Sequence, residues 1–130
     1  RLFGVKLGGS GDVTKTHRVW AREDVGAFVP TPAEYRGLLY VLGDRGQVEC
    51  VEPATGKTRW TAALPRASSN FYASPLIAGG VVISGINGCE RFKQEGCFIT
   101  GHDPQTGREL WRTSTIAQPG DPNNATWAVW

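Results

Sequence analysis

The sequence predicts an all-β fold made of repeated antiparallel units, each with four short strands. Three observations lead to this expectation. The 130 residues include 17 glycines and 8 prolines, which separate short runs rich in β-branched and aromatic residues. No stretch keeps apolar residues at helical spacing over three turns, so we expect essentially no helix. A ten-residue phrase also occurs twice, as VEPATGKTRW in 51–60 and HDPQTGRELW in 102–111.

The strand-like runs follow one another in a regular order. The chain opens with the run 1–7, the glycine-rich stretch GGSGD and a second run, 17–22. Two passes of four runs come next, each ending in one copy of the phrase. The first pass is 27–35, 37–43, 46–53 and 57–64, and the second is 70–78, 80–85, 96–104 and 108–116. Four strands in a unit of about 40–45 residues are typical of a β-propeller blade.

We therefore predict one partial β-propeller of about three blade equivalents. Its expected parts are a partial blade in 1–27, a blade in 28–69, a blade with an enlarged loop in 70–118 and the start of a further element in 119–130. Propellers close with about 4–8 blades, so the ring would need further blades or self-association. Because the chain starts at Arg1 and not at Met, we expect a processed piece or a fragment.

Each copy of the phrase reads acid-Pro-x-Thr-Gly-basic-x-x-Trp, and each part has an expected role. The glycine supplies the positive φ of a tight hairpin. The acid can accept backbone N–H bonds at that turn, and the tryptophan can wedge between neighbouring sheets and bury about 150–250 Å². These positions are Glu52, Gly56 and Trp60 in the first copy, and Asp103, Gly107 and Trp111 in the second.

The spacing of the two passes differs at one loop. Pro32 and Pro75 are 43 residues apart, whereas Thr55 and Thr106 are 51 apart. The second pass therefore carries 8 extra residues, within GINGCERFKQEG (85–96), where the first pass has only GDRG. Insertions in repeat folds gather on one face, which is often the binding face.

The two phrases resemble the tryptophan-docking repeats of quinoprotein propellers. Residues 85–130, with GINGCE, GCFITGHDPQTGRELWRTSTIAQPG and ATW, are similar to alcohol dehydrogenases that depend on pyrroloquinoline quinone (PQQ). Residues 1–80, with GGSGDVTKTHRVW and GLLYVLGDRGQVECVEPATG, look closer to PQQ-like repeats of non-catalytic secreted propellers. The resemblance implies a periplasmic or secreted, eight-bladed parent with PQQ near the central axis and Ca²⁺ beside it.

The same resemblance implies roles for four residues of the enlarged loop. Asn87 and Gly88 would approach PQQ, Cys89 would occupy the neighbouring small position, and Glu90 would bind Ca²⁺. Glycine permits close approach to a flat ligand, and a hard cation prefers carboxylate oxygens. The alternative for Glu90 is a solvated loop charge, since Ca²⁺ takes about 6–8 oxygens.

The chain also departs from the family pattern in ways that bear on activity. The link RFKQE after Glu90 is longer than usual. The paired adjacent cysteines, the catalytic Asp, the Asn that completes the ion site and the tryptophan beneath PQQ are not found in it. We thus expect no catalysis by this chain alone, within a parent that oxidises an alcohol or a sugar. The alternative is a non-catalytic scaffold that binds protein partners.

Composition excludes two further classes of partner. The net charge is only +2, and no basic run with interleaved aromatic residues is present, so we expect no nucleic acid. No apolar run approaches the roughly 20 residues of a membrane span.

Several single residues have simpler interpretations than chemistry. His102 is expected to be a strand histidine satisfied by hydrogen bonds and not a general base, and Cys50 a small buried residue. Cys89 and Cys97 flank one loop and could form a disulfide; free thiols or an incomplete metal pair are the alternatives. GGSGD lacks the context of a phosphate-binding loop and is expected to be a turn or linker. Trp127 falls in the turn-rich tail, where NAT (124–126) fits the glycosylation sequon by pattern only.

Overall fold

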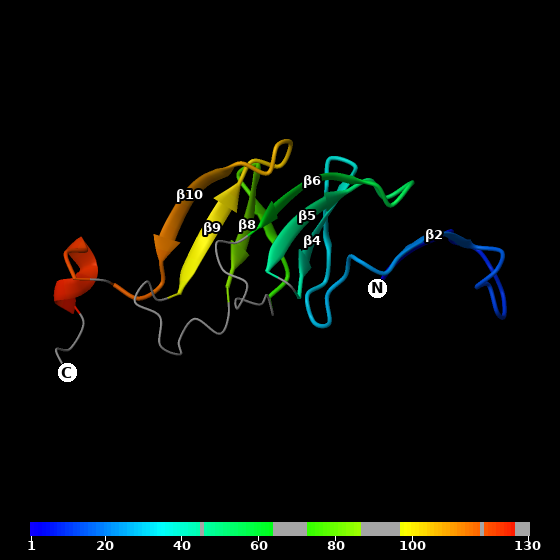
Figure 1. The fold of residues 1–130 in the computed structure, drawn as a ribbon, viewed down its shortest axis with the longest axis horizontal. Coiled ribbons are helices and arrows are strands. Elements are labelled where there is room, and N and C mark those ends of the chain that lie inside the picture. The colour runs from blue at the N-terminus through cyan, green and yellow to red at the C-terminus, as the bar shows by residue number, and fades with distance from the viewer. Residues whose placement is uncertain (45, 64–72, 87–96, 118, 127–130) are drawn as a thin grey trace.

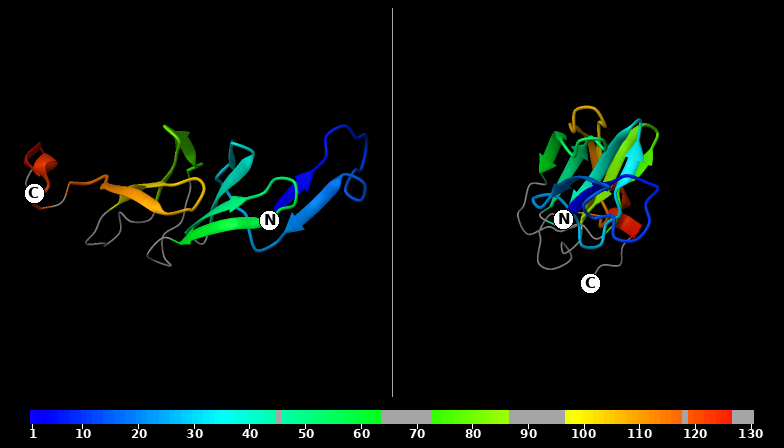
Figure 2. Two further views of the ribbon diagram at one scale, coloured as in Figure 1. Left: turned by 90° about the horizontal axis from the view of Figure 1, so that it is seen from above. Right: turned by 90° about the vertical axis from the view of Figure 1, so that its right-hand side faces the viewer.

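The computed structural model describes residues 1–44, 46–63, 73–86, 97–117 and 119–126. Within these ranges the strands form three antiparallel sheets, which we call sheet 1, sheet 2 and sheet 3 in chain order. They follow one another along the long axis of the chain, with sheet 2 in the middle (Figures 1 and 2). This arrangement confirms the expected all-β fold with units of four strands.

Consecutive strands pair with one another in every sheet. Sheet 1 contains β1 (Leu2–Val5) and β2 (Arg18–Arg22). Sheet 2 contains β3 (Ala33–Tyr35), β4 (Leu38–Gly43), β5 (Gln47–Val51) and β6 (Thr58–Ala63). Sheet 3 contains β7 (Leu76–Ala78), β8 (Val81–Gly85), β9 (Phe98–His102) and β10 (Glu109–Ser114).

The first strand of each four-stranded sheet is shorter than the sequence predicts. The extended run 27–35 contributes only β3, because Pro30 and Pro32 cannot donate a ladder hydrogen bond. The corresponding run 70–78 contributes only β7, which follows Pro75. Its residues 70–72 lie outside the described ranges.

Register relates sheet 1 to the other two sheets. The tryptophan of the last strand stands opposite a small residue in all three: Gly4 faces Trp20, Cys50 faces Trp60, and Gly101 faces Trp111. β1 and β2 therefore correspond to the third and fourth strands of sheets 2 and 3. Sheet 1 is half of the repeating unit.

The apolar core lies between the sheets. One cluster joins Tyr40 and Leu42 of β4 to Val82 and Phe98 of sheet 3. A second cluster, on the opposite face of sheet 2, joins Val41 to Val25 and Leu2. Sheet 2 is thus covered on both faces, which explains why its strand β4 is a nearly continuous apolar run.

One short helix differs from the expectation of essentially no helix. Residues Pro122–Thr126 form the 3₁₀ helix η1, near the C-terminus (Figure 1). A segment this short has no room for a 3.6-residue apolar period, so the search for periodicity could not detect it. No helix in the described ranges is long and apolar enough to cross a membrane.

Candidate functional site

The acid-Pro-x-Thr-Gly turn after β9 is closed by its aspartate. The Oδ1 atom of Asp103 accepts hydrogen bonds from the backbone N of Gln105 at 2.9 Å and of Thr106 at 2.8 Å. The bond from Thr106 is the main reason that the pKa of Asp103 lies below its ordinary value. Gly107 follows with φ 74°, as the turn requires. The predicted roles of aspartate and glycine are confirmed here.

The matching turn after β5 uses its acid differently. The Glu52 carboxylate accepts the Thr55 hydroxyl at 3.0 Å and pairs with Arg59 at 3.0 Å. The backbone N–H of Gly56 is bound instead by the Glu52 carbonyl, at 2.8 Å. The expectation that the Glu52 side chain accepts backbone N–H groups is therefore wrong. Its side chain is one methylene longer than aspartate, the length that suits such a turn.

Two tryptophans connect each sheet to the turn of the next. The Nε1 atom of Trp20 in β2 donates to the Pro53 carbonyl at 2.7 Å, and that of Trp60 in β6 donates to the Pro104 carbonyl at 2.9 Å. Tyr40 also donates its hydroxyl to the Pro104 carbonyl, at 3.1 Å, and burial raises its pKa to about 12. Each sheet is thus tied to the next by a buried or half-buried aromatic donor.

These indoles lie directly over the glycine of the receiving turn. A Cβ atom added at Gly56 would come within 2.6 Å of the Trp20 ring, and one at Gly107 within 2.5 Å of the Trp60 ring. Only glycine leaves room for such an approach. The repeated Thr-Gly therefore serves the contact between sheets as well as the turn itself.

Trp111 occupies the same position in sheet 3 as Trp60 does in sheet 2. Both are the third residue of the last strand, β6 or β10. Trp111 is 39% exposed, since the part of the chain that is described contains no later turn of this type. Its indole lies across Gly101 of β9, where an added Cβ would come within 2.2 Å of the ring. A glycine opposite the tryptophan lets the ring lie flat on the neighbouring strand.

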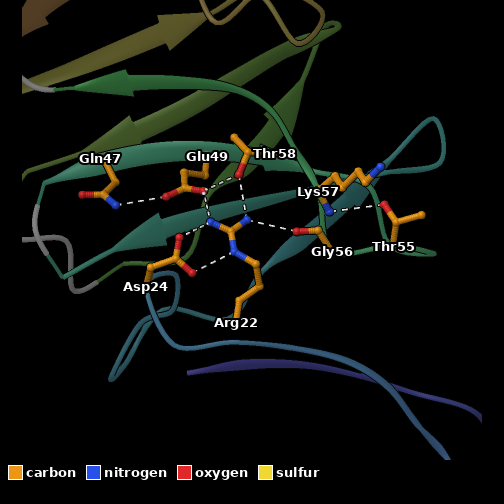
Figure 3. A network of polar contacts seen from close by, with 8 residues as sticks. All are labelled: Arg22, Asp24, Gln47, Glu49, Thr55, Gly56, Lys57 and Thr58. Atoms are coloured by element: carbon orange, nitrogen blue, oxygen red, sulfur yellow. Dashed lines mark hydrogen bonds and ion pairs between the residues drawn. The ribbon is translucent and has the colours of Figure 1, made fainter.

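A buried polar network adds a second link between sheets 1 and 2 (Figure 3). Arg22 of β2 donates from Nη1 to the Gly56 carbonyl at 3.0 Å and to the Thr58 hydroxyl at 2.7 Å. Its Nη2 lies 3.7 Å from Oε2 of Glu49, a carboxylate whose side chain is only 7% exposed. The hydrogen bond to Asp24 raises the pKa of Arg22 above its ordinary value. Sequence reasoning missed this network, because no motif surrounds Arg22 or Glu49.

His102 takes over part of that network's role in sheet 3. Its Nδ1 lies 3.1 Å from the Gly107 carbonyl, the counterpart of the Gly56 carbonyl. Its Nε2 lies 3.0 Å from the Thr100 hydroxyl, which in turn bonds to Ser84 at 2.9 Å. With 3% exposure and both ring nitrogens bonded, His102 is a structural histidine, as predicted.

The residues predicted to hold PQQ and calcium lie in 87–96, outside the described residues. These are Asn87, Gly88, Cys89 and Glu90. The enlarged loop does connect β8 to β9, at the position where the short turn of sheet 2 connects β4 to β5. Across the described part of the chain, no group of three or more His, Cys, Asp or Glu side chains could hold a metal ion.

The cysteines and loops can be placed in part. Cys50 is a buried free thiol, as predicted, and burial raises its pKa. Cys97 is disulfide-bonded. GGSGD lies in the loop that joins β1 to β2, so it is a turn and not a linker between units. The sequon NAT falls in η1, and Trp127 lies outside the described residues.

Comparison with known proteins places these features in a wider group. The PQQ_2 family model, described as outer membrane protein assembly factor BamB, matches residues 11–126. The quinohemoprotein alcohol dehydrogenase ADH-IIG of Pseudomonas putida is 34% identical over 93 residues, which are 69% of this chain and 12% of that protein.

Solved structures agree with this relationship. The quinohemoprotein alcohol dehydrogenase ADHIIG from Pseudomonas putida matches with a TM-score of 0.60 and 27% identity, over 68% of this chain and 13% of that one. The quinohemoprotein alcohol dehydrogenase from Comamonas testosteroni has a TM-score of 0.64 and 24% identity, over 81% and 18%. A europium-containing methanol dehydrogenase has 0.64 and 19%, over 81% and 20%. The chain thus spans at most 20% of each relative, and its fold is that of an incomplete β-propeller.

Proposed function

Because the chain belongs to the PQQ_2 repeat family, whose model is described as outer membrane protein assembly factor BamB, we propose that it supplies consecutive blades to a larger propeller. The contact that joins its sheets supports this proposal: a tryptophan N–H donates to the turn of the next sheet, twice in succession. We assign residues 1–27 to a partial blade, 28–69 to a blade, 70–118 to a blade with an enlarged loop and 119–130 to the next element.

The parent of this segment is, in our proposal, a periplasmic or secreted oxidoreductase that uses PQQ and Ca²⁺ to oxidise an alcohol or a sugar. The 34% identity to a quinohemoprotein alcohol dehydrogenase carries this part of the proposal. PQQ would supply the acceptor for the electrons of the substrate, and the chain alone is not catalytic.

The enlarged loop between β8 and β9 is the proposed contribution of this chain to the cofactor site. Asn87, Gly88 and Cys89 would approach PQQ, and the Glu90 carboxylate would bind Ca²⁺. The described residues alone do not fit a calcium site, since none of them gather into a metal-binding group. We therefore derive no catalytic step through either group.

A titration of the chain with PQQ and CaCl₂ tests this assignment, with the melting temperature and tryptophan fluorescence as readouts. We expect both ligands together to raise the melting temperature of the wild type, and Glu90→Ala to abolish the rise. Glu23→Ala is the matched control, because this exposed carboxylate pairs only loosely with Arg1, at 3.4 Å, on the far side of sheet 2 from sheet 3.

Two outcomes would remove the cofactor from this chain. One is the absence of any concentration-dependent shift in the wild type. The other is equal protection of the wild type and Glu90→Ala, which would show that the ligand binds elsewhere.

A non-catalytic scaffold is the second candidate function. The description of the family model, an outer membrane protein assembly factor, favours it. Such a segment would use loops or strand edges to bind protein partners and would need no quinone. It predicts no response to PQQ and Ca²⁺ in the same titration.

A further inference from the structure

Sheet 1 differs from the other two sheets at the turn that would receive a tryptophan. In sheets 2 and 3 the turn is closed by the bonds Glu52 N to Lys57 O and Asp103 N to Arg108 O. The corresponding bond in sheet 1 joins Lys6 N to His17 O, at 2.9 Å. The loop closed by this bond spans residues 7–16 and lacks the acid-Pro-x-Thr-Gly signature.

This loop cannot receive an indole in the way that the other turns do. Thr16 precedes the closing residue, where Gly56 and Gly107 stand in the other sheets. A Cβ atom at those glycines would come within 2.6 Å of the docked ring, so the threonine side chain occupies the space that an indole needs. A tryptophan such as Trp111 of a second copy is therefore a poor partner for sheet 1.

Sheet 1 nevertheless offers a strand edge and an apolar surface. β1 pairs only with β2 in the described chain, whereas the corresponding strands β5 and β9 each pair on both sides. A groove of about 340 Å³ lies beside β1 and is lined by Phe3, Val5, Val13, Thr14 and Arg18. Phe3 is 45% exposed and Val5 56%, although both lie in a strand. Free backbone groups beside exposed apolar side chains favour the addition of an extended strand.

Charge indicates what kind of strand fits. Four basic residues and one acid fall within 1–20, so this segment has a charge of +3 while the whole chain has +2. Arg18 lies over the Phe3 ring, 5.9 Å from its centre, and lines the groove itself. The acid, Asp12, is engaged with the backbone N of Thr14 at 3.0 Å. The rim of the groove is thus basic, with Lys6 and Lys15 exposed next to its lining residues.

We propose that β1 binds an extended segment of another protein in which carboxylates alternate with apolar side chains. The segment pairs with the free edge of β1 and places its apolar side chains beside Phe3 and Val5. Its carboxylates face Lys6, Lys15 and Arg18. This site lies on sheet 1, away from the enlarged loop of sheet 3, so it stands whether or not the parent protein binds PQQ.

Fluorescence anisotropy with a labelled peptide in which Glu alternates with Val tests the proposal. We expect the peptide to bind the wild-type chain, and a peptide in which Lys replaces Glu not to bind. Lys15→Glu should weaken binding about tenfold, whereas Lys57→Glu, a matched exposed lysine on the turn of sheet 2, should leave it unchanged. Phe3→Thr, which keeps a strand-forming residue, should weaken binding without changing the circular dichroism spectrum.

Nuclear magnetic resonance locates the peptide independently of affinity. The amides of Leu2–Val5 should show the largest shifts on binding. The proposal is overturned if the lysine peptide binds equally well, if Lys57→Glu weakens binding as much as Lys15→Glu, or if the shifts centre on another strand. It is also overturned if sedimentation shows a dimer that Lys15→Glu dissociates, because the occupant would then be a second copy.

Discussion

The contact between Trp60 and Gly107 offers the sharpest test of how the sheets are joined. Gly107→Ala adds a Cβ atom that would lie 2.5 Å from Cε3 and 2.7 Å from Cδ2 of the Trp60 ring. The indole has to move, and its hydrogen bond to the Pro104 carbonyl, 2.9 Å long, has to lengthen or break. The alanine also has to adopt the φ of 74° that Gly107 has.

The expected loss of unfolding free energy has two parts. The positive φ costs alanine about 1–2 kcal/mol. The lost hydrogen bond and the disturbed packing of the indole cost about another 1–2 kcal/mol. Gly37→Ala is a matched control, because Gly37 has φ 76° and a Cβ atom there would meet nothing within 4 Å. We therefore expect Gly107→Ala to cost about 2–4 kcal/mol and Gly37→Ala only about 1–2 kcal/mol.

Urea unfolding followed by circular dichroism measures both variants. The excess cost of Gly107→Ala over Gly37→Ala should disappear when Trp60 is replaced by Leu, since the ring that the Cβ atom displaces is then gone. Equal costs of the two glycine variants would refute the reasoning. An excess cost that persists in Trp60→Leu would refute it as well.

Two further predictions concern the polar links. Arg22→Met leaves the buried carboxylate of Glu49 without its cation, so we expect the free energy of unfolding to fall by about 2 kcal/mol or more, with recovery in Arg22→Met/Glu49→Leu; urea unfolding that shows no recovery would contradict this. Because the pKa of Asp103 is lowered in the folded chain, its stabilisation is present above the unfolded pKa near 3.8 and is lost as the pH falls through the lower folded value. Asp103→Asn should therefore flatten the pH dependence of the urea midpoint below about pH 5, and an unchanged dependence would contradict the assigned role.

Local features of the site could be predicted because each rests on a few neighbouring residues. Thr-Gly after Asp103 indicates the tight turn, and the strand position of His102 indicates a residue satisfied by its neighbours. The same reasoning failed at Glu52, where one extra methylene carries the carboxylate past the backbone N–H groups to Thr55 and Arg59. A small residue opposite each tryptophan was missed, although Gly101 and Cys50 stand at the same distance before the acid of their phrases.

By itself, the sequence determined the strands, the turns and their repetition. Alternation of side chains, the φ of glycine and the missing N–H of proline act within a few residues, so they can be read along the chain. Only the tertiary structure decided which face of a sheet meets which neighbour. Trp20 finds its acceptor 33 residues away, Arg22 finds Gly56 34 residues away, and Trp60 finds its acceptor 44 residues away. No local preference encodes such distances, because they arise from stacking one sheet on the next.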